Sequence, residues 1–205
     1  MIGGAERSGK TTILNRIMIR KPMIAIQTDA IRDSLMKALI DDTSISIIHL
    51  SLSGDATLQN SDNNFKKENT TKHFSKEISQ SELVWSATVG LISYYDNESV
   101  DLIIEGMEIT PERIKSLNLK NFLIKPVFVG FTEDTNFNKA VADLGKEGFN
   151  INDFDKDLLK KRFDEHVEKG KKIAISTNKQ GYKFFSFDNN DFESYCSNVI
   201  NYLLK

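Results

Sequence analysis

The sequence predicts an α/β fold with three α/β/α layers around a mostly parallel five-stranded sheet. Two observations support this. Short apolar runs typical of buried strands recur along the chain, and amphipathic helical patterns separate them. Such alternation favours a parallel sheet with helices on both faces. At 205 residues the chain is expected to form a single domain over residues 1–205.

Five segments are predicted as strands because each is short, apolar and bounded by polar or turn residues. In chain order they are residues 1–2, 22–27, 101–104, 127–131 and 182–187. The first is shorter than the usual strand of about five residues, because Gly3 and Gly4 follow it directly. A truncated first strand is therefore expected.

Helices are predicted where apolar residues recur at helical spacing. The segments are residues 13–18, 30–39, 79–96, 155–169, 171–179 and 192–203, with a further helix start at Thr110-Pro111. The charged helix from residue 155 is expected to be interrupted or to end at Gly170. Gly181 suits the position that follows a helix C-terminus. Residues 41–77 are polar and rich in Asn and Ser, so they are interpreted as a surface insert.

Composition limits the classes of partner. The chain has 27 Lys and Arg against 29 Asp and Glu, a net charge of -2, so bulk charge cannot drive binding to nucleic acid or acidic membranes. No apolar run reaches the roughly 18 residues that span a bilayer, and no signal peptide fits. The single Cys196 excludes an intrachain disulfide. A cytoplasmic protein is expected.

One motif points to chemistry. Gly4 to Thr11 matches G-x-x-x-x-G-K-[ST], the pattern of a loop whose backbone N–H groups surround phosphate oxygens. In this interpretation Lys10 contacts the same oxygens and Thr11 offers its hydroxyl to Mg²⁺. The alternative is a glycine-rich turn without function. The nucleotide-binding residues predicted from the motif are Gly4, Ala5, Glu6, Arg7, Ser8, Gly9, Lys10, Thr11 and Thr12.

Two carboxylates are expected beside this loop, because ligands of parallel sheets bind at the carboxyl ends of the strands. Asp29 follows the second predicted strand and is a candidate base; the alternative is a helix N-cap. Glu105 ends the third strand and is a candidate Mg²⁺ ligand; the alternative is a solvated acid. Arg32 could hold the acceptor or simply pair with Asp29 three residues earlier. Arg7 could touch phosphate or cover a nucleobase.

The phosphate-loop motif, Thr28-Asp29-x-x-Arg32, and Ile103-Ile-Glu-Gly106 with Thr110-Pro111 together resemble the small P-loop kinases of the adenylate-kinase-like group. The closest resemblance is to 2-phosphoglycerate kinase-like and zeta-toxin-like proteins. It implies the P-loop NTPase fold, ATP and Mg²⁺, and transfer of the γ-phosphate to a hydroxyl or carboxyl of a small molecule. It also implies catalytic roles for Lys10, Asp29 and Arg32, metal binding by Thr11 and Glu105, and adenine near Asp188-Asn189.

The chain also departs from these kinases. The expected lid, within residues 132–170, carries Lys139 and Lys146 between Phe131 and Asp155 but no arginine there, although Arg162 or Arg7 could substitute. An ATP-binding regulatory protein with little kinase activity is therefore an alternative. A nucleic-acid end kinase is a further one, since Lys66, Lys67, Lys72 and Lys76 could form a modest basic patch. The sequence leaves the acceptor, the choice of ATP or GTP, and the oligomeric state open.

Overall fold

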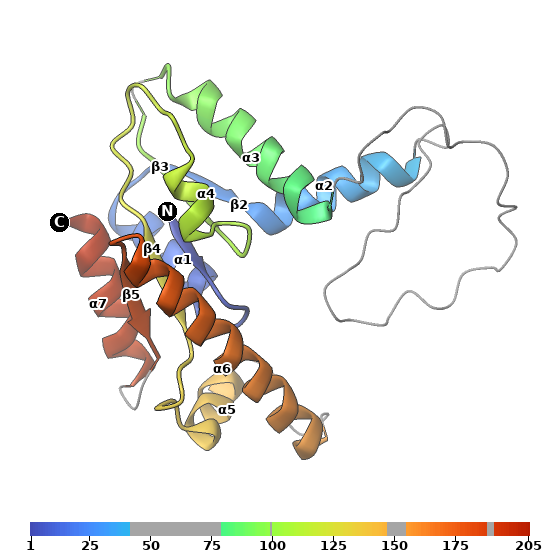
Figure 1. The fold of residues 1–205 in the computed structure, drawn as a ribbon. Coiled ribbons are helices and arrows are strands. Elements are labelled where there is room, and N and C mark those ends of the chain that lie inside the picture. Colours follow the sequence, from blue (N-terminus) through green and yellow to red (C-terminus); the bar gives the residue numbers. More distant parts are fainter. Residues whose placement is uncertain (42–78, 99, 147–154, 188–190) are drawn as a thin grey trace, which may run out of the picture.

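The computed structural model describes residues 1–41, 79–98, 100–146, 155–187 and 191–205 (Figure 1). The predicted insert therefore lies outside the described residues except for residue 41, and Asp188-Asn189 lies outside them too. None of the helices in the described part is both long and apolar enough to cross a bilayer.

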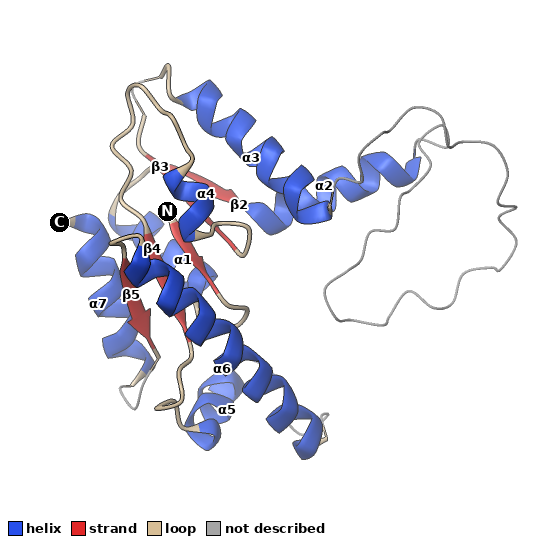
Figure 2. Ribbon diagram, viewed as in Figure 1, coloured by secondary structure: helices blue, strands red, loops and turns tan. Residues whose placement is uncertain are grey.

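The described strands form one parallel sheet of five, which confirms the predicted α/β fold. Its spatial order is β2 (Ile24–Gln27), β3 (Leu102–Gly106), β1 (Ile2–Gly4), β4 (Val127–Gly130) and β5 (Lys183–Ser186) (Figure 2). After β1 the chain forms β2 and β3 on one side of β1, and it then forms β4 and β5 on the other side of β1. The carboxyl end of β1 is therefore the point where the strand order reverses, the usual ligand position in such sheets.

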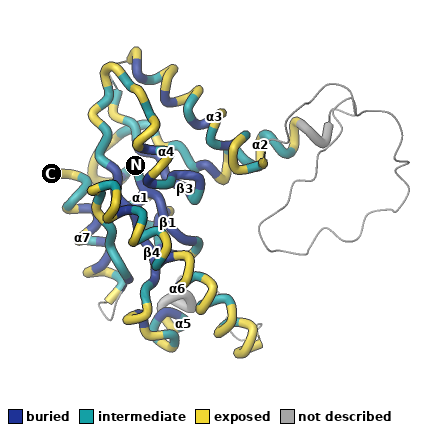
Figure 3. The backbone as a smooth tube through the Cα atoms, in the orientation of Figure 1, coloured by how far each residue is buried: buried dark blue, intermediate teal, exposed yellow. Residues whose placement is uncertain are grey.

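Helices pack on both faces of the sheet. Val127 and Val129 of β4 belong to an apolar cluster with α1 (Lys10–Arg20) and α7 (Phe192–Leu204). Phe128, between them, belongs to a second cluster with α3 (Gln80–Tyr95) and α4 (Pro111–Lys115). Since successive strand residues face opposite sides, the two clusters lie on opposite faces of the sheet. The residues of β1 and β4, between the two clusters, are buried (Figure 3). The arrangement is compatible with three layers.

The first strand is short, as predicted, but it includes both glycines instead of ending at Ile2. Close packing explains their presence. A Cβ at Gly3 would lie 2.3 Å from the Ile109 carbonyl oxygen, and one at Gly4 would lie 2.0 Å from that of Val129. Gly4 also has φ of 147°, which L side chains rarely adopt. The two glycines therefore let β1 lie between β3 and β4.

Two element predictions were wrong in detail. The strand over residues 22–27 was expected to be buried, but β2 is the edge of the sheet and exposes Ala25. The helix that follows, α2 (Thr28–Asp41), begins two residues earlier than expected. Asp29 therefore lies in its first turn and is not an N-cap.

Helix α6 (Lys156–Lys179) runs straight through Gly170, so the predicted interruption is also wrong. Gly170 is buried against the backbone that follows β4, where a Cβ would lie 1.9 Å from the Phe131 carbonyl oxygen. The glycine permits a close helix–sheet approach and does not end the helix. The predicted end was right: Gly181 follows the C-cap with φ of 74°.

The other helices that the sequence patterns predicted are present. Thr110 caps α4 through its side chain, and Pro111 is the first helical residue. Ser79 and Glu82 form a capping box at the start of α3. Helix α5 (Phe137–Lys146) was not predicted as a helix; it lies near the N-terminal part of α6, within the segment predicted as a lid (Figure 1).

Candidate functional site

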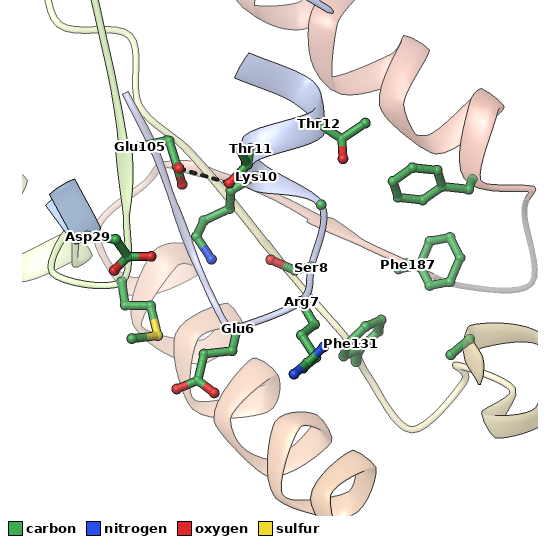
Figure 4. Close-up of a pocket in the computed structure, with 14 residues that line it drawn as sticks. Glu6, Arg7, Ser8, Lys10, Thr11, Thr12, Asp29, Glu105, Phe131 and Phe187 are labelled. Atoms are coloured by element: carbon green, nitrogen blue, oxygen red, sulfur yellow. Dashed lines mark hydrogen bonds between the residues drawn. The ribbon is translucent and has the colours of Figure 1, made fainter. Parts of the chain in front are cut away.

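A cavity of about 420 Å³ opens where β1 ends (Figure 4). Seven consecutive residues of the predicted phosphate loop, Glu6 to Thr12, line it. Gly4 and Ala5 do not line the cavity but lead into the loop. The other lining residues are Asp29, Glu105, Met107, Phe131, Ala140, Phe187 and Phe192. The structure therefore brings most of the predicted site residues to one place.

The loop between β1 and α1 is held by backbone geometry and buried hydrogen bonds. Gly9 is the N-cap of α1 with φ of 82°, and no side chain caps this helix. Arg7 has φ of 58°. The Ser8 hydroxyl donates to the Ala5 carbonyl at 2.7 Å, and the Tyr195 hydroxyl donates to the Ser8 carbonyl at 2.8 Å. The partial positive charge of the helix N-terminus therefore faces the cavity.

Lys10 is the first residue of α1 and is only 8% exposed. Its ammonium group donates to the Ala5 carbonyl oxygen at 2.7 Å and points into the space enclosed by the loop (Figure 4). Burial lowers the pKa of Lys10, and the carboxylates of Glu105 and Asp29 partly oppose that shift. A buried cation with one carbonyl partner is well suited to receive an anion.

Thr11 and Glu105 both line the cavity and are hydrogen-bonded to each other. The Thr11 hydroxyl donates to Glu105 Oε1 at 2.9 Å, and Gln27 Nε2 donates to the same oxygen at 3.0 Å. Glu105 is 3% exposed, which rules out the solvated-acid interpretation. Among the described residues no group of three or more His, Cys, Asp or Glu gathers to hold a metal. A hydroxyl and a carboxylate nevertheless fit Mg²⁺, which usually keeps several waters and substrate phosphates as ligands.

Asp29 lines the cavity across from Lys10 (Figure 4). Arg32 does not line it. Arg32 Nη1 instead donates to Asp29 Oδ1 at 2.5 Å, so the alternative of an intrahelical pair is present. Its Nη2 donates to Oε1 of Glu108, a residue that sequence reasoning did not select as functional. The sequence signal that could have identified Glu108 was its position as a second acidic residue, three residues after Glu105.

The far end of the cavity is aromatic. Phe131 follows β4 and Phe187 follows β5, with ring centroids 5.8 Å apart in an edge-to-face arrangement. Phe192, at the start of α7, contacts Phe187 in the same manner. Sequence analysis missed these residues, although Phe131 and Phe187 end predicted strands at the sheet edge where ligands bind.

The predicted lid contributes only partly within the described residues. Ala140 of α5 lines the cavity, whereas Arg162 does not. On α6, Lys169 Nζ lies 3.6 Å from Glu6 Oε1, so this helix contacts the loop. Residues 147–154 of the predicted lid lie outside the described part.

No protein-family model matches the chain, and a search of the curated proteins finds no significant match.

Proposed function

We propose that the protein binds ATP with Mg²⁺ and transfers the γ-phosphate to a hydroxyl or carboxyl of a small-molecule acceptor. One observation supports this most directly. A single cavity is lined by the residues of a phosphate-loop motif, with the carboxylates Asp29 and Glu105 beside it. In this proposal the core is a P-loop NTPase fold.

The shape and polarity of the cavity suit a nucleotide. Its volume of about 420 Å³ falls within the range of small-molecule sites. In the proposal the buried ammonium of Lys10 and the uncapped start of α1 receive the phosphates. The aromatic end, with Phe131 and Phe187, receives the base by stacking.

Each residue then has a chemical role. When bound, Mg²⁺ neutralises charge on the phosphates, and Thr11 and Glu105 would hold it. Asp29 accepts the proton of an acceptor hydroxyl as that oxygen bonds to the γ-phosphorus and the bond to ADP breaks. A carboxylate acceptor would need no such proton transfer. Lys10 stabilises the charge on the transferring group.

Mass spectrometry of a metabolite mixture incubated with ATP and Mg²⁺ tests the proposal, with Lys10→Ala as the control. The expected result is one metabolite heavier by a phosphoryl group with the unmodified protein and none with the variant. Calorimetry of ATP binding provides the second measurement. An unmodified protein without measurable affinity for ATP would overturn the proposal.

One observation favours an ATP-binding regulatory protein as a second candidate. Arg32, expected to hold the acceptor, is instead bound by two carboxylates of the protein itself. This candidate predicts ATP binding by the unmodified chain and loss of binding in Lys10→Ala, with no phosphorylated product. A single phosphorylated metabolite would eliminate it.

A further inference from the structure

A buried carboxylate lies behind the candidate base. Glu108, in the turn that follows β3, is 5% exposed and binds two residues of α2. The Thr28 hydroxyl donates to its Oε2 at 2.5 Å, and Arg32 Nη2 donates to its Oε1. Burial by itself raises the pKa of Glu108, but these hydrogen bonds outweigh it and hold the pKa below its usual range. Glu108 is therefore an ionised anchor for the start of α2.

Thr28 and Arg113 hold the turn that carries Glu108 in place. Thr28 is fully buried against β3, and a Cβ at Gly106 would lie 1.7 Å from its hydroxyl oxygen. Arg113 Nη1 donates to the main-chain carbonyl of Glu108 at 3.0 Å. The guanidinium of Arg113 also lies 5.6 Å from the ring centroid of Trp85 on α3. The turn after β3 and the first turn of α2 are therefore joined by packing and by buried hydrogen bonds.

Arg32 connects Glu108 to Asp29. Its side chain is 17% exposed, whereas that of Asp29 is 62% exposed. Nη2 of its guanidinium donates to Glu108, and Nη1 donates to Oδ1 of Asp29. The fork geometry of arginine fixes both carboxylates at once. Asp29 itself lines the cavity, so this pair holds its carboxylate at the cavity wall.

We propose that Glu108 is a positioning residue, which acts through Arg32 to direct the Asp29 carboxylate toward the acceptor. The inference rests on the proposed function, because it assigns a role toward the same base. Glu108 also shares the guanidinium of Arg32, so that Arg32 binds both carboxylates and not Asp29 alone. Lys10 at the start of α1 and Glu105 at the end of β3 line the same cavity, as do Glu6 and Arg7 of the loop.

The main test is Glu108→Gln, which keeps the shape and removes the charge. We expect kcat for hydrolysis of MgATP, with water as acceptor, to fall about tenfold while the KM for ATP stays unchanged. The matched control is Glu112→Gln, whose carboxylate accepts a hydrogen bond from the Ser176 hydroxyl on α6. It should leave both kcat and the KM for ATP unchanged.

Arg32→Lys is the second variant, and it keeps the charge but cannot bridge two carboxylates with one planar group. It should lower kcat without changing the KM for ATP. When combined with Glu108→Gln it should add little further loss, because both changes break the same connection. If Glu108→Gln does not fold, the inference is still tested by Arg32→Lys, in which kcat should fall while the KM for ATP stays unchanged. Equal kcat in Glu108→Gln and Glu112→Gln, or an equal rise in KM and fall in kcat, would overturn the inference.

A measurement without activity separates this inference from the proposed function. The carboxyl carbon of Asp29 can be observed by ¹³C NMR in the nucleotide-free protein at neutral pH. We expect its resonance to move in Glu108→Gln, because the Arg32 guanidinium that binds Asp29 then loses its second carboxylate partner, and to stay in place in Glu112→Gln. Failure of ATP binding together with this change would refute only the kinase. ATP hydrolysis with an unmoved Asp29 resonance would refute only the role of Glu108.

Discussion

Replacing Gly170 by alanine is expected to destabilise the protein, although alanine is the better helix former. In a helix interior the substitution gains about 1 kcal/mol in propensity. At this position, however, the new Cβ would lie 1.9 Å from the Phe131 carbonyl oxygen, where real contacts stay above 3.0 Å. Helix α6 must therefore retreat from β4 by about 1 Å. Because the clash is with backbone and not with a flexible side chain, the cost of overpacking should lie at the upper end of the usual range, about 3 kcal/mol. After the propensity gain of about 1 kcal/mol, a net loss of about 2 kcal/mol is expected.

Urea unfolding followed by circular dichroism measures this effect, with Gly90→Ala as the matched control. Gly90 also lies in a helix interior, but a Cβ there meets nothing within 4 Å. With a slope of about 2 kcal/mol per molar urea, the midpoint of Gly170→Ala should fall by about 1 M and that of Gly90→Ala should rise by about 0.5 M. A Gly170→Ala midpoint at or above that of the unmodified protein would refute the close contact. Because Phe131 lines the cavity, the affinity for ATP should fall as well.

Three further predictions follow from individual contacts. Lys10→Met should weaken ATP binding about 10- to 100-fold by calorimetry. It should not lower the thermal midpoint of the free protein, because it removes a buried ammonium and Ser8 still donates to the Ala5 carbonyl. Asp29→Asn should keep the dissociation constant for ATP within about twofold and reduce phosphotransfer about 10²- to 10⁴-fold; full activity would exclude Asp29 as the base. The backbone N–H of Lys120, assisted by those of Asn121 and Phe122, lowers the pKa of Asp96. The ionised Asp96 carboxylate should therefore contribute fully to the free energy of unfolding above about pH 4, and this contribution should fade as the pH drops through the lowered pKa of Asp96. Thermal scans should accordingly show the gap between the unmodified protein and Asp96→Ala closing on acidification, and a constant gap would contradict this.

The sequence by itself predicted the features that depend on local pattern. Alternating apolar runs and helical stripes predicted the parallel sheet and its helices, because burial on one or two faces leaves a fixed period in the chain. The phosphate-loop motif also predicted which consecutive residues would gather at one cavity, since loop, Lys10 and Thr11 are adjacent in sequence. The caps of α4 and α6 were readable for the same reason.

Only the tertiary structure decided the contacts between residues far apart in sequence. Gly170 looked like a helix end until its place against Phe131 showed that it permits close packing. The sequence left Arg32 either to hold an acceptor or to pair with Asp29, but its second partner, Glu108, lies 76 residues away and is brought beside it by the pairing of β2 with β3. A local pattern records the face that a residue turns to the core. The partner across that core is set by the order of the strands, which brings together segments that have no common pattern in the sequence.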